Sequence, residues 1–141
     1  MCSSDLDHDS FRLTGKSRVV MDAANHAGIC FWGGRTGGCL QVTPVSGSLW
    51  DYRGGGEVRT LPRTLDYMQW HFFELLVDAK TGNVDIAVEG HAYPTYTDKK
   101  AHTKGPIQLQ LHAKPNEVQY KDLAVEDNPT VNKLLTVIPG K

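Results

Sequence analysis

The sequence predicts an all-β fold, an antiparallel β-sandwich assembled from short strands. Apolar and polar residues alternate along several short stretches, which is the pattern of strands with one buried face. Turn-forming residues recur along the whole chain, which contains 14 glycines, as many short strands joined by turns require. No stretch shows the apolar spacing of a long helix. A length of 141 residues fits one domain and suffices to bury a core.

The first half of the chain is expected to form short strands separated by glycine-rich loops. These strands are predicted at residues 11–13, 18–21, 29–32 and 39–42. The first two are expected to pair around a turn at Gly15 and Lys16. The loop at residues 33–38 is rich in glycine, which lets its backbone approach a ligand closely.

The clearest local pairing is a hairpin of residues 70–78 and 84–89, joined by a turn at residues 80–83. Apolar side chains occupy alternate positions in both strands, at Phe73, Leu75, Val77, Val84, Ile86 and Val88. Each strand is therefore expected to bury one face.

A closing hairpin is predicted from strands at residues 107–112 and 118–125, with a turn at residues 114–116. In its first strand Ile107, Leu109 and Leu111 alternate with Gln108, Gln110 and His112. The polar row is expected on the face opposite the core. Two glutamines and a histidine in such a row favour a polar site.

Residues 105–113 read Gly-Pro-Ile-Gln-Leu-Gln-Leu-His-Ala. This segment resembles the Gly-Pro-Ile-x-Leu-Gln-x-His-Gly motif of the 3-keto-disaccharide hydrolase domain family, and further similar segments are residues 25–32, 47–53, 69–75 and 89–92. The family's members are sandwiches related to the concanavalin-like lectins and glucanases. The resemblance implies a jelly-roll of the concanavalin A-like lectin/glucanase type, and hydrolysis of 3-keto-glycosides or 3-keto-disaccharides.

The resemblance also implies domain limits. Members usually have further strands before the position of Phe11, so residues 11–127 are expected to form one sandwich domain that lacks its first strands. Residues 1–10 are polar and unpatterned and are predicted to be a non-native or disordered leader. Residues 128–141 are expected to be a C-terminal tail, because Asn128 and Pro129 end the last strand. Since members are usually exported, an extracytoplasmic location is implied, although the chain carries no signal peptide.

Cleavage of a 3-keto-glycoside needs one base rather than a pair of carboxylates. The ketone at C3 acidifies the proton at C2, so a base can remove that proton and expel the C1 oxygen, with water added afterwards. Histidine suits such a base near neutral pH. The resemblance makes His112 the first candidate and His26 the second, with Gln110 and Arg35 as orienting or oxyanion-holding groups. From the residues alone, His112 is instead a solvated strand residue and His26 a turn residue.

Aromatic and polar residues near the glycine-rich loops are candidates for a sugar site. Flat rings stack on sugar faces, and polar side chains bind hydroxyl groups. The predicted substrate-binding residues are Asn25, Trp32, Arg35, Gln41, Trp50, Asp51, Tyr52, Arg53 and Arg59. Core packing of the rings and ordinary surface exposure of the charged residues are the alternatives.

Two departures from the family pattern leave a second function open. Residues 39–42 lack an acidic residue often found there, and Leu111 stands where members commonly have aspartate. The alternative to an enzyme is therefore a non-catalytic carbohydrate-binding module that uses the same face, and a third hypothesis is an inactive fragment. Cys30 and Cys39 flank the glycine-rich loop, where a disulfide and two buried thiols are both compatible with the sequence.

Carbohydrate is the partner that the resemblance implies, and composition argues against two other classes of partner. The formal net charge of −1 argues against nucleic-acid binding through a basic surface. No apolar run reaches the length needed to cross a membrane. No cofactor is evident: six histidines are enough to bind a divalent metal, but none has the spacing of a recognised zinc motif.

Overall fold

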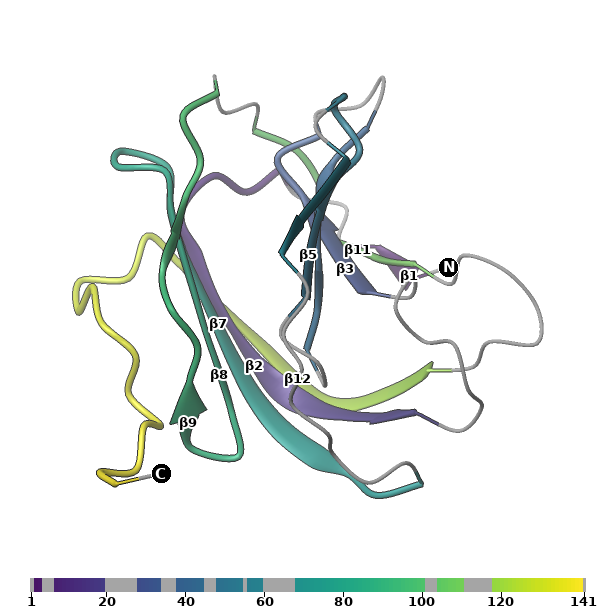
Figure 1. Ribbon diagram of the computed structural model, residues 1–141, viewed down its shortest axis with the longest axis vertical. Coiled ribbons are helices and arrows are strands. Elements are labelled where there is room, and N and C mark those ends of the chain that lie inside the picture. The colour runs from purple at the N-terminus through teal and green to yellow at the C-terminus, as the bar shows by residue number, and fades with distance from the viewer. Residues whose placement is uncertain are drawn as a thin grey trace.

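The computed structural model describes residues 2–3, 7–19, 28–33, 38–44, 48–54, 56–59, 68–100, 104–110 and 118–140. Over these residues the chain forms two antiparallel sheets of six strands each, and the sheets face one another (Figure 1). This arrangement confirms the predicted antiparallel β-sandwich. No helix in the described residues is long and apolar enough to cross a membrane.

The first sheet has the strand order β1-β11-β3-β4-β5-β6. Its strands are β1 (Cys2–Ser3), β11 (Gln108–Gln110), β3 (Gly28–Phe31), β4 (Leu40–Thr43), β5 (Ser48–Asp51) and β6 (Gly56–Arg59). Strands β3 to β6 follow one another along the chain and pair in that order. β11 adds a segment from the end of the chain beside β3.

The second sheet has the order β10-β8-β7-β2-β12, and β9 pairs with β8. Its strands are β10 (Tyr96–Thr97), β8 (Asn83–Val88), β7 (His71–Asp78), β2 (Phe11–Val19), β12 (Val118–Asp127) and β9 (His91–Ala92). β7 and β8 form the predicted hairpin, with Val77 opposite Val84. β2 lies between β7 and β12, so that Phe11 is opposite both Val77 and Asp127.

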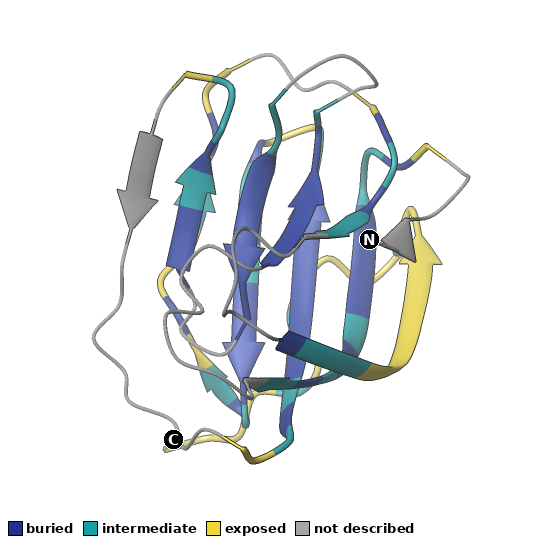
Figure 2. Cartoon of the chain, turned by 90° about the vertical axis from the view of Figure 1, so that its right-hand side faces the viewer, coloured by how far each residue is buried: buried dark blue, intermediate teal, exposed yellow. Residues whose placement is uncertain are grey.

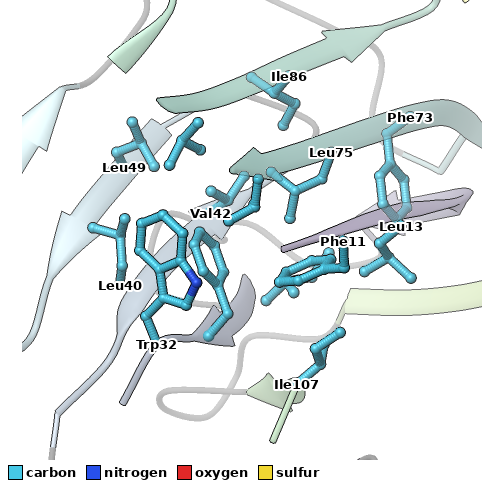
Figure 3. Close-up of a cluster of buried hydrophobic side chains, with 14 of the residues drawn as sticks. Phe11, Leu13, Trp32, Leu40, Val42, Leu49, Phe73, Leu75, Ile86 and Ile107 are labelled. Carbon is cyan, nitrogen blue, oxygen red and sulfur yellow. The ribbon is translucent and has the colours of Figure 1, made fainter. Parts of the chain in front are cut away.

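The core lies between the sheets and takes alternate side chains from each. The first sheet contributes Ile29, Phe31, Leu40, Val42 and Leu49, and the second contributes Phe11, Leu13, Phe73, Leu75, Val77, Val84, Ile86 and Val88. Figure 3 shows side chains of the two layers meeting, among them Leu40, Val42 and Leu49 of the first sheet and Phe11, Leu13, Phe73, Leu75 and Ile86 of the second. The edge-to-face contact of Phe11 with Phe31, with ring centroids 5.6 Å apart, joins the sheets directly.

Strand β2 corrects the first predicted hairpin. Residues Phe11–Val19 form one continuous strand rather than two strands around a turn at Gly15 and Lys16. Gly15 is instead opposite Phe73 of β7. A Cβ atom at Gly15 would lie 2.5 Å from Cδ2 of Leu123 on β12. The glycine therefore makes room for a neighbouring side chain within the sheet.

The predicted closing hairpin is also wrong. β11 pairs with β1 and β3 in the first sheet, whereas β12 pairs with β2 in the second. The two segments are close in sequence but belong to different layers of the sandwich. Ile107 just before β11 is buried as expected, whereas β12 is buried at Val118 and exposed over its second half (Figure 2). The alternation of apolar and polar residues predicted that these segments are strands, but not which strands they pair with.

The described part of residues 1–10 takes part in the fold. β1 pairs with β11, and His8 exchanges backbone hydrogen bonds with Gly105. Nδ1 of His8 also lies 2.6 Å from Oδ1 of Asp127, at the end of β12. These contacts contradict a disordered segment for the residues that are described.

The C-terminal tail, residues 128–140, lies against the outer face of the second sheet (Figure 1). The ion pair of Arg12 and Glu74 anchors it, with Nε and Oε2 2.8 Å apart and side chains only 6% and 0% exposed. Arg12 Nη2 donates hydrogen bonds to the carbonyl oxygens of Val131 and Lys133, both at 2.8 Å. Glu74 accepts hydrogen bonds from the backbone N–H of Leu135. The predicted tail is therefore docked through buried charges.

Candidate functional site

A row of residues in register crosses the outer face of the first sheet. Gln108 of β11 is opposite Cys30 of β3, Cys30 is opposite Gln41 of β4, and Gln41 is opposite Trp50 of β5. Residues opposite each other on neighbouring strands share a face of the sheet. The positions next to them point into the core, as Ile29, Val42 and Leu49 do. We call Gln108, Cys30, Gln41 and Trp50 the outer row.

At one end of the outer row, the rings of Trp50 and Tyr52 form a half-buried pair. Their centroids are 5.8 Å apart and their planes make an angle of 38°. The backbone N–H of Tyr52 donates a hydrogen bond to the carbonyl oxygen of Cys39 at 2.8 Å. Gly38 permits close packing there, since a Cβ atom on it would lie 1.9 Å from the carbonyl oxygen of Tyr52. The two rings are thus held at the surface, where they can contact the apolar face of a flat ligand.

The side chain of Gln41 is buried beside this ring pair, with 1% of the residue exposed. Its Nε2 has no acceptor among the residues that the structure describes. A buried amide donor without a partner is unfavourable, so a bound water or a ligand oxygen is the expected acceptor. Cys30 and Cys39 form a disulfide on the same face, with Cα atoms 5.5 Å apart. The bond braces β3 against the segment that enters β4.

Four charged residues form a cluster at the end of β5. Asp51 has a side chain that is 1% exposed, and its carboxylate accepts hydrogen bonds from Arg53 Nε at 2.9 Å and Lys100 Nζ at 2.5 Å. Arg53 Nη2 also donates to Oδ2 of Asp98 at 3.0 Å. Because Asp98 follows β10 at the edge of the second sheet, the cluster links the two sheets.

The contacts within this cluster keep Asp51 and Arg53 charged. Burial alone would raise the pKa of Asp51, but hydrogen bonds from Arg53 and Lys100 lower it from 3.8 to about 2. Burial alone would lower the pKa of Arg53, whereas its bonds to Asp51 and Asp98 raise it. Groups that stay charged throughout the neutral range are poorly suited to proton transfer. The ion pairs of this cluster therefore hold the two sheets together.

Among the predicted site residues whose side chains the structure describes, some lie together and others do not. Trp50, Tyr52 and Gln41 come together on the outer face of the first sheet. Asp51 and Arg53 lie next to them but are engaged in the charged cluster. Trp32 is fully buried in the core, where its Nε1 donates to the carbonyl oxygen of Asp9 at 2.7 Å. Trp32 thus has a packing role in place of the predicted stacking role.

Several predicted site residues lie outside the described residues, namely Asn25, His26, Arg35 and His112. Only the backbone is described for Gln110 and Arg59, in β11 and β6. In the backbone register of the first sheet, position 110 is opposite Gly28 of β3. Among the described residues, no group of three or more His, Cys, Asp or Glu side chains is placed to hold a metal ion.

Sequence reasoning missed Asp98 and Lys100, which lie 45 residues from Arg53 and 49 residues from Asp51, respectively. No local pattern indicates such distant partners. The sequence does predict that Trp50 and Asp51 point to opposite faces, since neighbouring residues of a strand do so. This alternation separates the ring pair from the charged cluster.

A hollow of about 280 Å³ lies at the end of β7, lined by Ser10, Val77, Asp78, Lys80, Asn128, Pro129 and Asn132. Its carboxylate, Asp78, accepts hydrogen bonds from Asn132 Nδ2 at 2.8 Å and from the backbone N–H of Lys80 at 2.9 Å. The lining residues include no aromatic ring. The hollow is therefore a weaker candidate for a sugar site than the ring pair.

No protein-family model matches the sequence, and no curated protein matches it significantly. Solved structures with similar folds do exist. A carbohydrate-binding module, CBM66 from Bacillus subtilis, matches with a TM-score of 0.64 and 9% identity, covering 88% of this chain and 79% of that chain. A SAP-like pentraxin from Limulus polyphemus matches with a TM-score of 0.54 and 9% identity, covering 87% of this chain and 67% of that chain. At these identities the likeness shows the β-sandwich fold alone.

Proposed function

We propose that this domain binds carbohydrate and that its sugar site is the outer face of the first sheet at Trp50 and Tyr52. The observation that carries the proposal is the half-buried ring pair beside the buried amide of Gln41. Rings supply apolar contact to a sugar face, and amides bind hydroxyl groups. The similarity in fold to a carbohydrate-binding module supports the proposal.

The outer row suggests how a longer ligand would lie. From Trp50 to Gln108 the row crosses three strand spacings, which is about 14 Å. Cys30 and Gln41 in the middle of the row are only 2% and 1% exposed, so a ligand would contact the half-buried Trp50 and Gln108 at its two ends. A ligand long enough to reach both residues is an oligosaccharide rather than a single sugar.

Isothermal titration against a neutral β-glucan, a xylan and a fructan tests this site. The wild-type protein should bind at least one of them, and Trp50→Ala should weaken that binding about tenfold, since a ring contact is worth about 1 kcal/mol or slightly more. The matched control is Trp70→Ala, a tryptophan of similar exposure outside the outer row, and it should bind the same polymer as the wild type does. Equal losses for the two variants, or no binding by folded wild-type protein, would contradict the assignment.

Cleavage of 3-keto-glycosides is the second candidate function. The pairing of β11 with β3 supports it, because the backbone of position 110 then belongs to the same sheet as Trp50. In this case His112 acts as the base and Gln110 orients the substrate, as the sequence resemblance implies. Incubation with a 3-keto-glucoside distinguishes the two functions. Release of the aglycone that is lost in His112→Ala would identify an enzyme, whereas binding without release would identify a binding module.

We also propose an extracytoplasmic location. The disulfide of Cys30 and Cys39 supports it, because such bonds persist in oxidising compartments. Alkylation and mass spectrometry of the protein from its native host would check this proposal. Two alkylated thiols at these positions would argue for a reducing compartment.

A further inference from the structure

Three cations gather on the outer face of the second sheet, where β2 and β12 are adjacent (Figure 1). Lys16 and Lys121 are direct partners in register, and Arg18 is opposite Gln119. We call Lys16, Arg18 and Lys121 the cationic patch. The side chain of Lys16 is 43% exposed, and Lys121 is also exposed. The patch therefore presents positive charge to solvent.

Trp70, which immediately precedes β7, organises this patch. Cζ of Arg18 lies 4.7 Å from the centroid of the Trp70 ring, and Nζ of Lys121 lies 4.1 Å from it. Such cation–π contacts are favourable and restrict where the two charged groups lie. Oε1 of Gln119 accepts hydrogen bonds from Nε of Arg18 at 2.9 Å and from its Nη2. The guanidinium group is thus positioned from two sides.

The patch is electrostatically unfavourable in the absence of an anion. Like charges directly opposite each other on neighbouring strands destabilise a sheet, and Lys16 is directly opposite Lys121. Asp122 pairs with Lys16 at 3.8 Å, but its carboxylate is 67% exposed, so the pair contributes little. The whole chain has a net charge of −1. The patch is therefore a local concentration of positive charge rather than a reflection of basic composition.

We propose that the cationic patch binds the carboxylate groups of an acidic polysaccharide, a polymer of uronic acids. Arg18 has guanidinium N–H groups beyond those bound to Gln119, and a carboxylate accepts such groups in a paired geometry. Lys121 places a second positive charge beside it. The site lies on a different sheet from Trp50 and does not depend on the sugar site proposed there.

The chemistry of the patch favours an acidic polysaccharide over a nucleic acid. Affinity for nucleic acid comes from many phosphate contacts, and three cations on a chain with a net charge of −1 supply few. A uronic acid polymer presents hydroxyl groups beside each carboxylate. The amide of Gln119, next to Arg18, is a suitable partner for them.

The test is isothermal titration of the full chain with tetragalacturonate and with its methyl ester, which has the same sugars without the charges. Wild-type protein should bind the acid more tightly than the ester. Arg18→Gln and Lys121→Gln should each weaken binding of the acid about tenfold, because each removes a charged hydrogen bond. Lys80→Gln, the same change of charge in the turn between β7 and β8, is the control that should bind like the wild type.

Trp70→Leu adds a test of positioning. This variant keeps both cations but removes the ring that positions them, so its affinity for tetragalacturonate should fall. Raising the sodium chloride concentration should weaken binding of tetragalacturonate to the wild-type protein more steeply than binding to the Arg18→Gln variant. Equal binding of acid and ester, or an equal loss in Lys80→Gln, would overturn the proposal. It would equally be overturned if single-stranded DNA or anionic phosphatidylserine vesicles bound through Lys121 while tetragalacturonate did not.

Discussion

Replacing Glu74 with glutamine should destabilise the domain strongly, because Glu74 is the buried anchor of the C-terminal tail. Its carboxylate accepts hydrogen bonds from Arg12 Nε at 2.8 Å, from Leu135 N–H at 2.9 Å, and from the N–H and hydroxyl of Thr136 at 3.0 and 2.7 Å. Glutamine would remove the negative charge and direct an amide N–H group towards backbone donors. Arg12 would then lie buried without its main counter-charge.

The size of the loss follows from the burial of the pair. Breaking a buried ion pair from one side costs about 3–5 kcal/mol. Arg12 keeps one further partner, Glu126 at 2.6 Å, so the lower end, about 3 kcal/mol, is expected for Glu74→Gln. For a domain of this size, about 3 kcal/mol lowers the Tm by about 10 °C. This is a large part of a total stability of about 5–15 kcal/mol.

Urea unfolding followed by tryptophan fluorescence measures this loss. The matched control is Glu126→Gln, which removes the other carboxylate on Arg12. Since the side chain of Glu126 is 53% exposed, its loss should cost less than about 1 kcal/mol. Similar losses for the two variants, or a Glu74→Gln variant as stable as the wild type, would refute the idea that burial makes Glu74 the stronger partner.

Three further predictions concern the first sheet and its edge. Replacing Cys30 and Cys39 together with serine should lower the free energy of unfolding by about 2–3 kcal/mol, as expected for a short loop with a sequence separation of 9; an unchanged urea midpoint would contradict a stabilising disulfide. The folded-state pKa of Asp51, about 2, lies below its ordinary value of 3.8. The contribution of Asp51 to the free energy of unfolding is therefore complete above about pH 4 and is lost as pH falls towards about 2. Asp51→Asn should flatten the dependence of stability on pH in that window, and an unaltered slope would argue against it. Gly38→Ala should disturb the ring pair, because its Cβ would lie 1.9 Å from the backbone oxygen of Tyr52; near-ultraviolet circular dichroism identical to the wild type would refute this.

Local patterns in the sequence identified strands better than they identified pairings. The β7–β8 hairpin was predictable, because its short turn keeps both partners close in sequence. The segments at β11 and β12 carry the same type of alternation, yet they join different sheets. Their partners, β3 and β2, lie far away in the chain, and alternation holds no information about such distant edges. Gly15 was mistaken for a turn because its neighbour in space, Leu123, is also distant.

The candidate site shows the same limit. Trp50 and Tyr52 were predictable from a short run of aromatic and polar residues, but the pairing of Asp51 with Lys100 depends on the approach of the two sheets. Trp32 departs from strand alternation because its φ of 58° is left-handed, a conformation rare for a bulky residue. Its ring is therefore buried next to that of the preceding residue, Phe31, with centroids 5.3 Å apart. Nothing in the neighbouring residues predicted that reversal.

The position of β2 in the second sheet also governs when the protein can fold during its synthesis. β2 leaves the ribosome before both of its partners, β7 and β12, and Phe11 pairs with Asp127. At the usual rate of translation the interval between these two residues is about 5–20 s. During that time one edge of β2 has no partner strand, so the nascent chain has to be kept from pairing with other chains until β12 emerges.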